Sequence, residues 1–92
     1  MLDKYIHGNV SRISPAAPVQ IVNVTAEKFL PGGAANVAVN LSALNCTSSL
    51  FGITGEDEAL KIMISKLRKN SVKKEGVITD PTRPTIQKVR II

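Results

Sequence analysis

The feature that most constrains the fold is a pair of glycines directly before an alanine-rich segment, in the run Pro31-Gly32-Gly33-Ala34-Ala35-Asn36. After it, Val37, Leu41 and Leu44 recur at the i, i+4 and i+7 spacing of one helix face. The spacing predicts a helix that opens at the glycines and runs to about Leu44. Its small alanines predict close packing against a sheet.

The rest of the chain alternates between strand and helix patterns. Short strand patterns occupy residues 19–24, 48–54, 77–79 and 85–92. A second helix begins near Glu56 and Asp57, where its dipole favours anions, and carries the apolar stripe Leu60, Met63, Ile64 and Leu67. Turn signals such as Gly8-Asn9 and Ser14-Pro15 predict irregular structure over residues 1–17, and residues 25–31 read as a loop.

This order of elements predicts an α/β fold with a parallel sheet and packed helices. The strands at residues 19–24 and 85–92 do not fit into that parallel layer. We therefore expect them to form a small separate sheet lying over it.

Composition excludes several function classes. Aromatic residues make up only 3% of the 92 residues, which argues against proteins that bind single-stranded nucleic acid by base stacking. The single Cys46 excludes an intramolecular disulfide and a multi-cysteine zinc site, and it suits a reducing compartment. His7 has no second histidine to join it in a metal site, and no apolar run is long enough to span a membrane.

The net charge of +5 comes largely from one cluster at the end of the second predicted helix. Its members are Lys66, Arg68, Lys69, Lys73 and Lys74. A nucleic-acid surface is one interpretation. The other is the solvated carboxyl end of a helix, where the dipole favours cations. We favour the second and expect no nucleic-acid partner, because no recognition motif accompanies the charge.

The glycine pair has two interpretations when taken alone. Glycines at a helix start let a ligand approach the backbone, and free N–H groups there can donate to anions or hydroxyls. Asn36 in the first turn offers a donor and an acceptor to a ligand rich in hydroxyls. Tight helix–sheet packing is the more frequent reason for such a glycine pair before an alanine-rich helix. The segment is neither a P-loop nor a dinucleotide fingerprint, because the residues that complete those motifs are missing.

Together with its surroundings, the segment resembles the N-terminal signature of the ribokinase (PfkB-type) sugar kinase family. The matching positions are Gly32, Gly33, Asn36, Ala38 and Gly55, and Asn45 stands where the family usually has Gly or Ser. The flanks at residues 1–5, 10–15, 17–19 and 84–90 look like the kinase domain of the bacterial heptose-7-phosphate kinase/ADP-heptose synthases. Asn9 and Ala16 depart from that group, which usually has Asp and Glu there.

The resemblance implies the N-terminal part of a ribokinase-like fold spanning residues 1–92. Residues 32–79 would form the α/β core portion, and residues 10–30 and 84–92 would form strands of a small β lid. The implied reaction is phosphorylation of the anomeric hydroxyl of heptose 7-phosphate with ATP and Mg²⁺. It would serve ADP-heptose and lipopolysaccharide core synthesis in the cytoplasm, in a homodimer formed through the lid.

The resemblance also implies a set of substrate-binding residues. Asp3 matches an acidic residue that holds sugar hydroxyls, and the sugar-contacting loop and helix start carry Gly32, Gly33 and Asn36. Lys88 and Arg90 would face the substrate phosphate, although an ordinary exposed strand face explains them as well. A turn or helix cap is the structural alternative for Asp3.

The catalytic Gly-Ala-Gly-Asp motif of the family does not occur in the sequence, nor do its nucleotide-binding segments. We therefore expect no catalytic residue, no metal site and no kinase activity in this chain alone, whether it is a truncated gene product or part of a longer protein. One alternative is a non-catalytic binding or dimerisation remnant of such a kinase. Another is a ribokinase relative that acts on a different sugar.

Overall fold

The structure is a computed structural model that describes residues 1–14, 16 and 19–92. The described elements are β1 (Leu2–Ile13), β2 (Gln20–Pro31), α1 (Ala34–Ala43), β3 (Ser49–Thr54), α2 (Glu58–Lys69), β4 (Lys73–Thr79) and β5 (Gln87–Ile91). Pro15, which contributes to a predicted turn, lies outside the described residues. Neither helix is long and apolar enough to cross a membrane.

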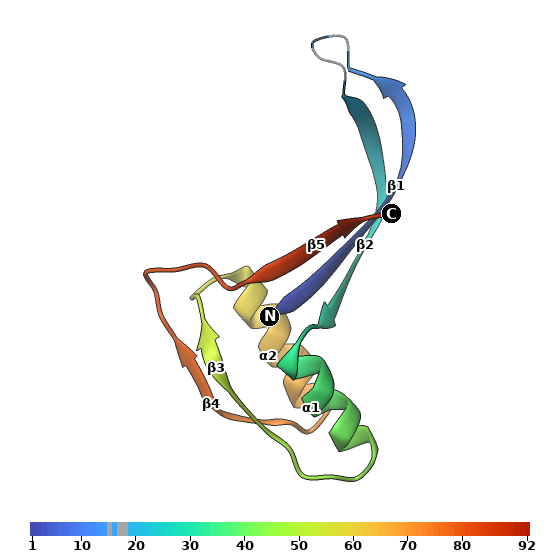
Figure 1. Cartoon of the computed structure of the whole chain (residues 1–92). Helices are drawn as coiled ribbons and strands as arrows, with labels where there is room; N and C mark the ends of the chain where they lie inside the picture. The colour runs from blue at the N-terminus through green and yellow to red at the C-terminus, as the bar shows by residue number, and fades with distance from the viewer. Residues whose placement is uncertain (15, 17–18) are drawn as a thin grey trace.

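The strands form two separate sheets (Figure 1). In the three-stranded lid sheet, β1 lies between β2, which is antiparallel to it, and β5, which is parallel to it. In the second sheet, β3 and β4 pair in parallel and are connected through α2. The prediction of a parallel α/β layer with a small separate sheet is therefore confirmed.

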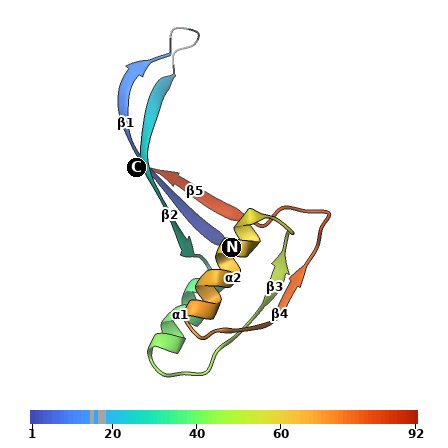
Figure 2. The same ribbon diagram turned by 180° about the vertical axis from the view of Figure 1, so that it is seen from behind.

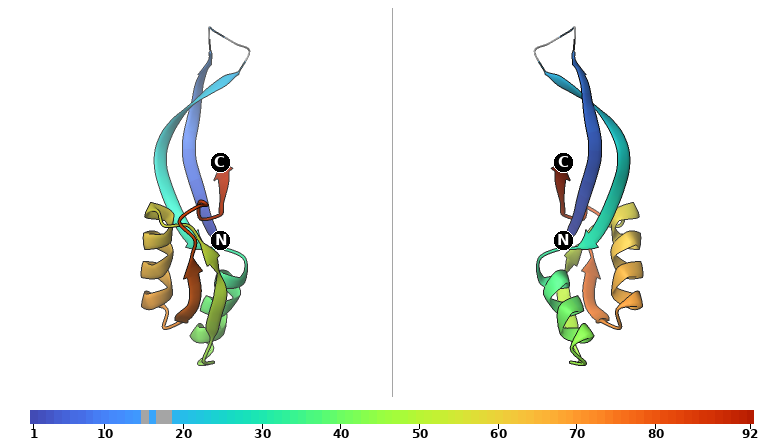
Figure 3. Two further views of the ribbon diagram at one scale, coloured as in Figure 1. Left: turned by 90° about the vertical axis from the view of Figure 1, so that its left-hand side faces the viewer. Right: turned by 90° about the vertical axis from the view of Figure 1, so that its right-hand side faces the viewer.

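The molecule is elongated, because the β1–β2 hairpin extends away from the helices (Figure 3). Its radius of gyration is 16.3 Å, whereas a compact domain of this length has about 12 Å. Its accessible surface is 6375 Å², against about 5,200 Å² for a compact protein of this mass. Apolar side chains account for part of the surplus, and Phe51 and Ile53 on β3 and Ile78 on β4 are exposed.

The core is small and lies where the start of β1 meets the two helices. It consists of Leu2, Ala35, Ala38, Ala59, Met63, Leu67 and Val72. Leu2 and Leu67 are fully buried, and each stabilises the fold by roughly 1.5–3 kcal/mol relative to an exposed side chain. Ala35 and Ala38 of α1 face this core. The predicted apolar face of that helix is wrong, because Val37, Leu41 and Leu44 are exposed.

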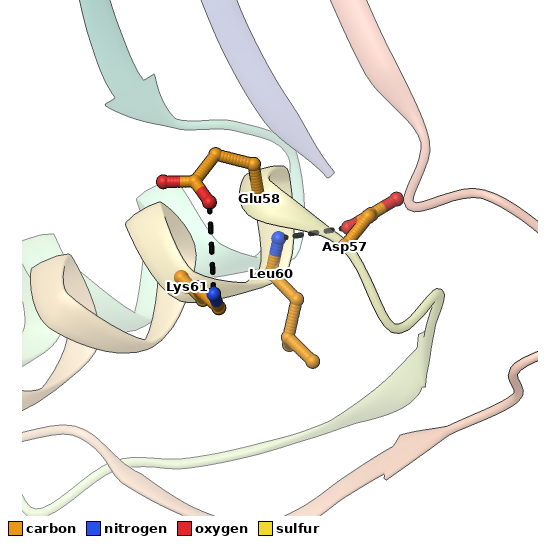
Figure 4. A network of polar contacts seen from close by, with 4 residues as sticks. All are labelled: Asp57, Glu58, Leu60 and Lys61. Carbon is orange, nitrogen blue, oxygen red and sulfur yellow. Dashed lines mark hydrogen bonds and ion pairs between the residues drawn. The ribbon is translucent and has the colours of Figure 1, made fainter.

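Asp57 begins α2 in the way that the sequence predicts. Its carboxylate caps the helix by accepting a hydrogen bond from the Leu60 N–H at 3.0 Å (Figure 4). Glu58 follows in the first turn and pairs with Lys61 at 3.8 Å, an exposed contact of little energetic weight. Lys66, Arg68 and Lys69 occupy the last turn, near the negative end of the helix dipole.

Two stretches expected to be irregular are strands instead. β1 covers most of residues 1–17, and Gly8 lies within it at a shift of the pairing register. A Cβ at Gly8 would lie 2.5 Å from the Asn23 carbonyl oxygen, so the glycine permits a close approach of backbones and does not make a turn. β2 continues through residues 25–31 as an edge strand. Residues 23–28 are exposed, so the sequence there shows no alternation of apolar and polar residues that would indicate a strand.

The last two strands also differ from the prediction. β4 begins at Lys73, four residues before the predicted start. The prediction missed these residues because the first three are charged and the apolar run covers only the end of the strand. β5 begins at Gln87, whereas the prediction began it at Thr85. Thr85 is buried against Gly55 and Asp57 instead, as described below.

Candidate functional site

A cleft of about 390 Å³ lies between the lid sheet and the two helices, at the junction seen from behind in Figure 2. Its polar lining consists of Asp3 and Tyr5 from β1, Asn36 from α1, and Lys66, Lys69 and Asn70 from α2 and its carboxyl end. Its apolar lining consists of Leu30, Pro31 and Val39. The volume falls within the roughly 300–1,000 Å³ of small-molecule sites.

Asp3 has an unpaired polar atom in this cleft. It is the second residue of β1, and its Oδ1 is buried without a hydrogen-bond partner among the described residues. An acceptor left in this state costs roughly 1–3 kcal/mol. Because Asp3 also lines the cleft, its carboxylate is the acceptor that a bound hydroxyl would meet there.

Gly32 makes room for that carboxylate. A Cβ at this position would collide with Oδ1 and Cγ of Asp3, so any other residue would push the carboxylate away. The Gly32 N–H donates to the Met1 carbonyl oxygen at 2.9 Å, which fixes the end of β2 beside the start of β1. Gly32 thus belongs to the same unit as Asp3.

Gly33 is required for a different reason. Its backbone has φ +54° and ψ −127°, a combination that residues with a Cβ avoid. Its carbonyl oxygen accepts from the Asn36 N–H at 3.1 Å, and no side chain caps the helix. The bend at Gly33 brings Asn36, in the first turn of α1, to the cleft, where its amide can both donate and accept.

Lys88 and Arg90 lie beside this cleft without lining it. Lys88 is the register partner of Asp3 and Arg90 that of Tyr5, so these pairs share one face of the lid sheet. Both cations are exposed. The structure therefore unites Asp3, Asn36 and Gly32, and leaves the basic pair on the neighbouring strand.

A buried hydrogen-bond network connects β5 to the start of α2. Thr85 donates to Asp57 through its N–H at 2.9 Å and through its hydroxyl at 2.7 Å, and the Gly55 N–H donates to the Thr85 hydroxyl at 3.0 Å. These donations from Thr85, joined by that of Leu60, lower the pKa of the Asp57 carboxyl below its usual value. The network holds the strand that carries Lys88 and Arg90 in place.

The comparisons with known proteins identify the family. Residues 5–92 match the family description "pfkB family carbohydrate kinase". The chain belongs to the PfkB carbohydrate kinase family. It is 48% identical over 92 residues to the bifunctional protein HldE of Photorhabdus laumondii and 49% identical to that of Pectobacterium atrosepticum. Each alignment covers 100% of this chain and 19% of the relative, so the chain spans about a fifth of these proteins.

Solved structures show the same fold. Arabidopsis thaliana ribokinase complexed with ribose and ATP aligns with a TM-score of 0.77 and 20% identity, covering 98% of this chain and 28% of that one. A carbohydrate kinase from Agrobacterium tumefaciens aligns with a TM-score of 0.73 and 22% identity, covering 99% of this chain and 28% of that one. The PfkB chain is thus the N-terminal part of a ribokinase-like fold.

Four polar residues that line the cleft were not predicted as site residues. Lys66 and Lys69 were interpreted as part of the solvated end of a helix, Asn70 was not singled out, and Tyr5 fell in a stretch expected to be irregular. The i, i+3, i+4 spacing of the three α2 residues does place them on one helix face. Nothing in the sequence indicates that this face turns toward Asp3, because that depends on how α2 packs against the lid sheet.

Proposed function

We propose that this chain is the sugar-binding part of a carbohydrate kinase that phosphorylates heptose 7-phosphate at its anomeric hydroxyl with ATP. Membership of the PfkB family and similarity to HldE proteins support the reaction class and the substrate. The structural observation that carries the proposal is the cleft that Asp3 lines together with Asn36. These groups match a ligand rich in hydroxyls.

In this proposal each site residue has a defined task. Asp3 accepts a hydrogen bond from one sugar hydroxyl, and Asn36 both donates to and accepts from others. Gly32 keeps space for the carboxylate, and Gly33 gives α1 the start that places Asn36. The assignment of the sugar phosphate to Lys88 and Arg90 remains a prediction.

The groups that transfer the phosphoryl group would lie outside this chain. Phosphoryl transfer needs a positioned nucleotide, charge stabilisation and a proton acceptor together. The sequence contains no Gly-Ala-Gly-Asp motif, and residues 1–14, 16 and 19–92 contain no cluster of three His, Cys, Asp or Glu side chains for a metal ion. The residues present therefore do not fit a Mg²⁺ site. The use of ATP by the complete kinase is supported by the similar fold of the ribokinase complexed with ribose and ATP. We expect the chain alone to bind sugar without consuming ATP.

The cellular setting is part of the same proposal. The complete kinase would act in the cytoplasm and supply ADP-heptose for the lipopolysaccharide core. It would form a homodimer through the lid, where Val10, Val24, Val89 and Ile91 are exposed. Those exposed residues also favour the second candidate, a non-catalytic sugar-binding or dimerisation module.

Calorimetric titration of the chain with heptose 7-phosphate, and separately with ATP, tests the proposal. We expect sugar binding, no ATP binding, and a roughly ten- to hundredfold loss of sugar affinity in Asp3→Ala and in Asn36→Ala. Asn40→Ala, exposed on α1 outside the cleft, is the matched control and should bind normally. Binding of ATP in place of sugar, or ATP turnover that Asn36→Ala abolishes, would contradict the proposal.

A further inference from the structure

We infer that Lys66 and Lys69 form an anion subsite in the cleft, which holds the phosphate of a phosphorylated sugar whose hydroxyls meet Asp3 and Asn36. The inference rests on the proposed function, because it assigns the charged end of the ligand in the same site. It moves the phosphate from the lid strand β5, where the sequence placed it, to the carboxyl end of α2.

The geometry of α2 brings the two lysines to one place. They are three residues apart, so their side chains share a helix face with Asn70. All three residues line the cleft together with Asp3 and Asn36. The lining of the cleft therefore combines a carboxylate and an amide with two ammonium groups.

Neither lysine has a partner that would neutralise it. The ion pairs among the described residues are Lys4 with Glu27 at 3.5 Å and Lys61 with Glu58 at 3.8 Å. Lys66 is partly buried, which weakens the screening of its charge by water. With two cations and the single carboxylate of Asp3 in its lining, the cleft carries a net positive charge.

The helix dipole does not cancel this charge. The carboxyl end of a helix is negative chiefly because its last carbonyl groups are unpaired. Here the Asn70 N–H donates to the Lys66 and Leu67 carbonyl oxygens at 3.2 Å, and the Asn70 side-chain amide donates to the Lys66 oxygen at 2.8 Å. The Val72 N–H donates to Leu67 at 3.1 Å. These hydrogen bonds satisfy the Lys66 and Leu67 carbonyl groups and so reduce the negative potential at this end of the helix.

A sugar phosphate complements both parts of the cleft, whereas a neutral sugar leaves the two ammonium groups without an anion. Charge-assisted hydrogen bonds to phosphate are about twice as strong as neutral ones. Lys66 and Lys69 would therefore set the preference for phosphorylated over unphosphorylated sugar. Lys88 and Arg90 are exposed and outside the cleft, which makes them the weaker candidates.

The test compares three double variants of the full 92-residue chain by calorimetric titration with heptose 7-phosphate and with the unphosphorylated heptose. Lys66→Ala/Lys69→Ala removes the inferred subsite, and Lys88→Ala/Arg90→Ala removes the rival site. Arg68→Ala/Lys74→Ala is the matched control, because it lowers the net charge by the same amount outside the cleft. Circular dichroism verifies the fold of each variant.

We expect Lys66→Ala/Lys69→Ala to weaken heptose 7-phosphate binding at least about tenfold and to leave heptose binding within about twofold. The other two variants should keep the preference for the phosphate. Loss of that preference in Lys88→Ala/Arg90→Ala, with Lys66→Ala/Lys69→Ala unaffected, would overturn the inference and leave the proposed function standing. Absence of binding to either ligand by the unaltered chain would overturn both.

Discussion

Replacing Asp3 with alanine is predicted to make the protein more stable while it weakens sugar binding. The buried Oδ1 has no partner among the described residues, and an unpaired buried acceptor costs roughly 1–3 kcal/mol. Asp3 as a whole is only half-buried, so we take the lower end of this range. Removal of the carboxylate should raise the free energy of unfolding by about 1 kcal/mol, which corresponds to an increase in Tm of about 4–8 °C for a domain of this size.

Urea unfolding followed by circular dichroism measures this change as a higher midpoint at an unaltered m value. Asp80→Ala is the matched control, because it removes the same charge from a carboxylate that has partners. Asp80 accepts from the Thr82 N–H at 2.9 Å and from the Thr82 hydroxyl at 2.6 Å, so its removal should lower the midpoint. If Asp3→Ala lowers the midpoint as Asp80→Ala does, then Asp3 is a structural residue and the reasoning is refuted.

Three further predictions concern stability and association. Thr85→Val leaves the buried Gly55 N–H unpaired and should cost roughly 1–3 kcal/mol in urea unfolding. Thr85→Ser, which keeps the hydroxyl, should cost clearly less, and equal losses would contradict the network. Because the folded-state pKa of Asp57 lies below its value of 3.8 in the unfolded chain, its stabilisation is complete above that pH and is lost as the pH falls through the folded pKa. The Tm should therefore decrease as the pH is lowered below about 4, and it should decrease less in Asp57→Asn. An equal decrease in both proteins would exclude this cause. Ile53 and Ile78 are register partners with exposed fractions of 59% and 65%, so they form an apolar surface through which the chain can self-associate. Ile53→Thr/Ile78→Thr should shift sedimentation from self-associated to monomeric protein. Unaltered sedimentation would show that this face is not the contact.

Elements with a strong local signal could be predicted from the sequence. The apolar stripe of α2 and its cap at Asp57 act within one or two turns of helix, so the sequence pattern is sufficient. The position of α1 was predicted as well, because its start depends on the backbone of Gly33 itself. Its buried face was not, because the apolar residues Val37, Leu41 and Leu44 are exposed. The parallel β3–α2–β4 unit follows from the order of these elements.

The lid sheet was harder to predict because its strands lack apolar alternation. Most residues of β2 are exposed, so no buried face imposes a period of two. Gly8 indicates a turn in the sequence but serves a close approach to β2, which only the paired structure reveals.

The site divides in the same way. The resemblance to sugar kinases predicted Asp3, Gly32 and Asn36 as substrate-binding residues, and the structure brings them together. The position of Lys66 and Lys69 depends on how α2 packs against the lid sheet, a long-range contact without a local signature.

The most direct test of the central claim is a crystal structure of the chain with heptose 7-phosphate bound. The account predicts the sugar in the cleft, with hydroxyl oxygens within about 2.6–3.2 Å of the Asp3 carboxylate and the Asn36 amide. A sugar bound elsewhere on the molecule, with Asp3 and Asn36 free of contacts to it, would contradict the claim that this cleft is the sugar site.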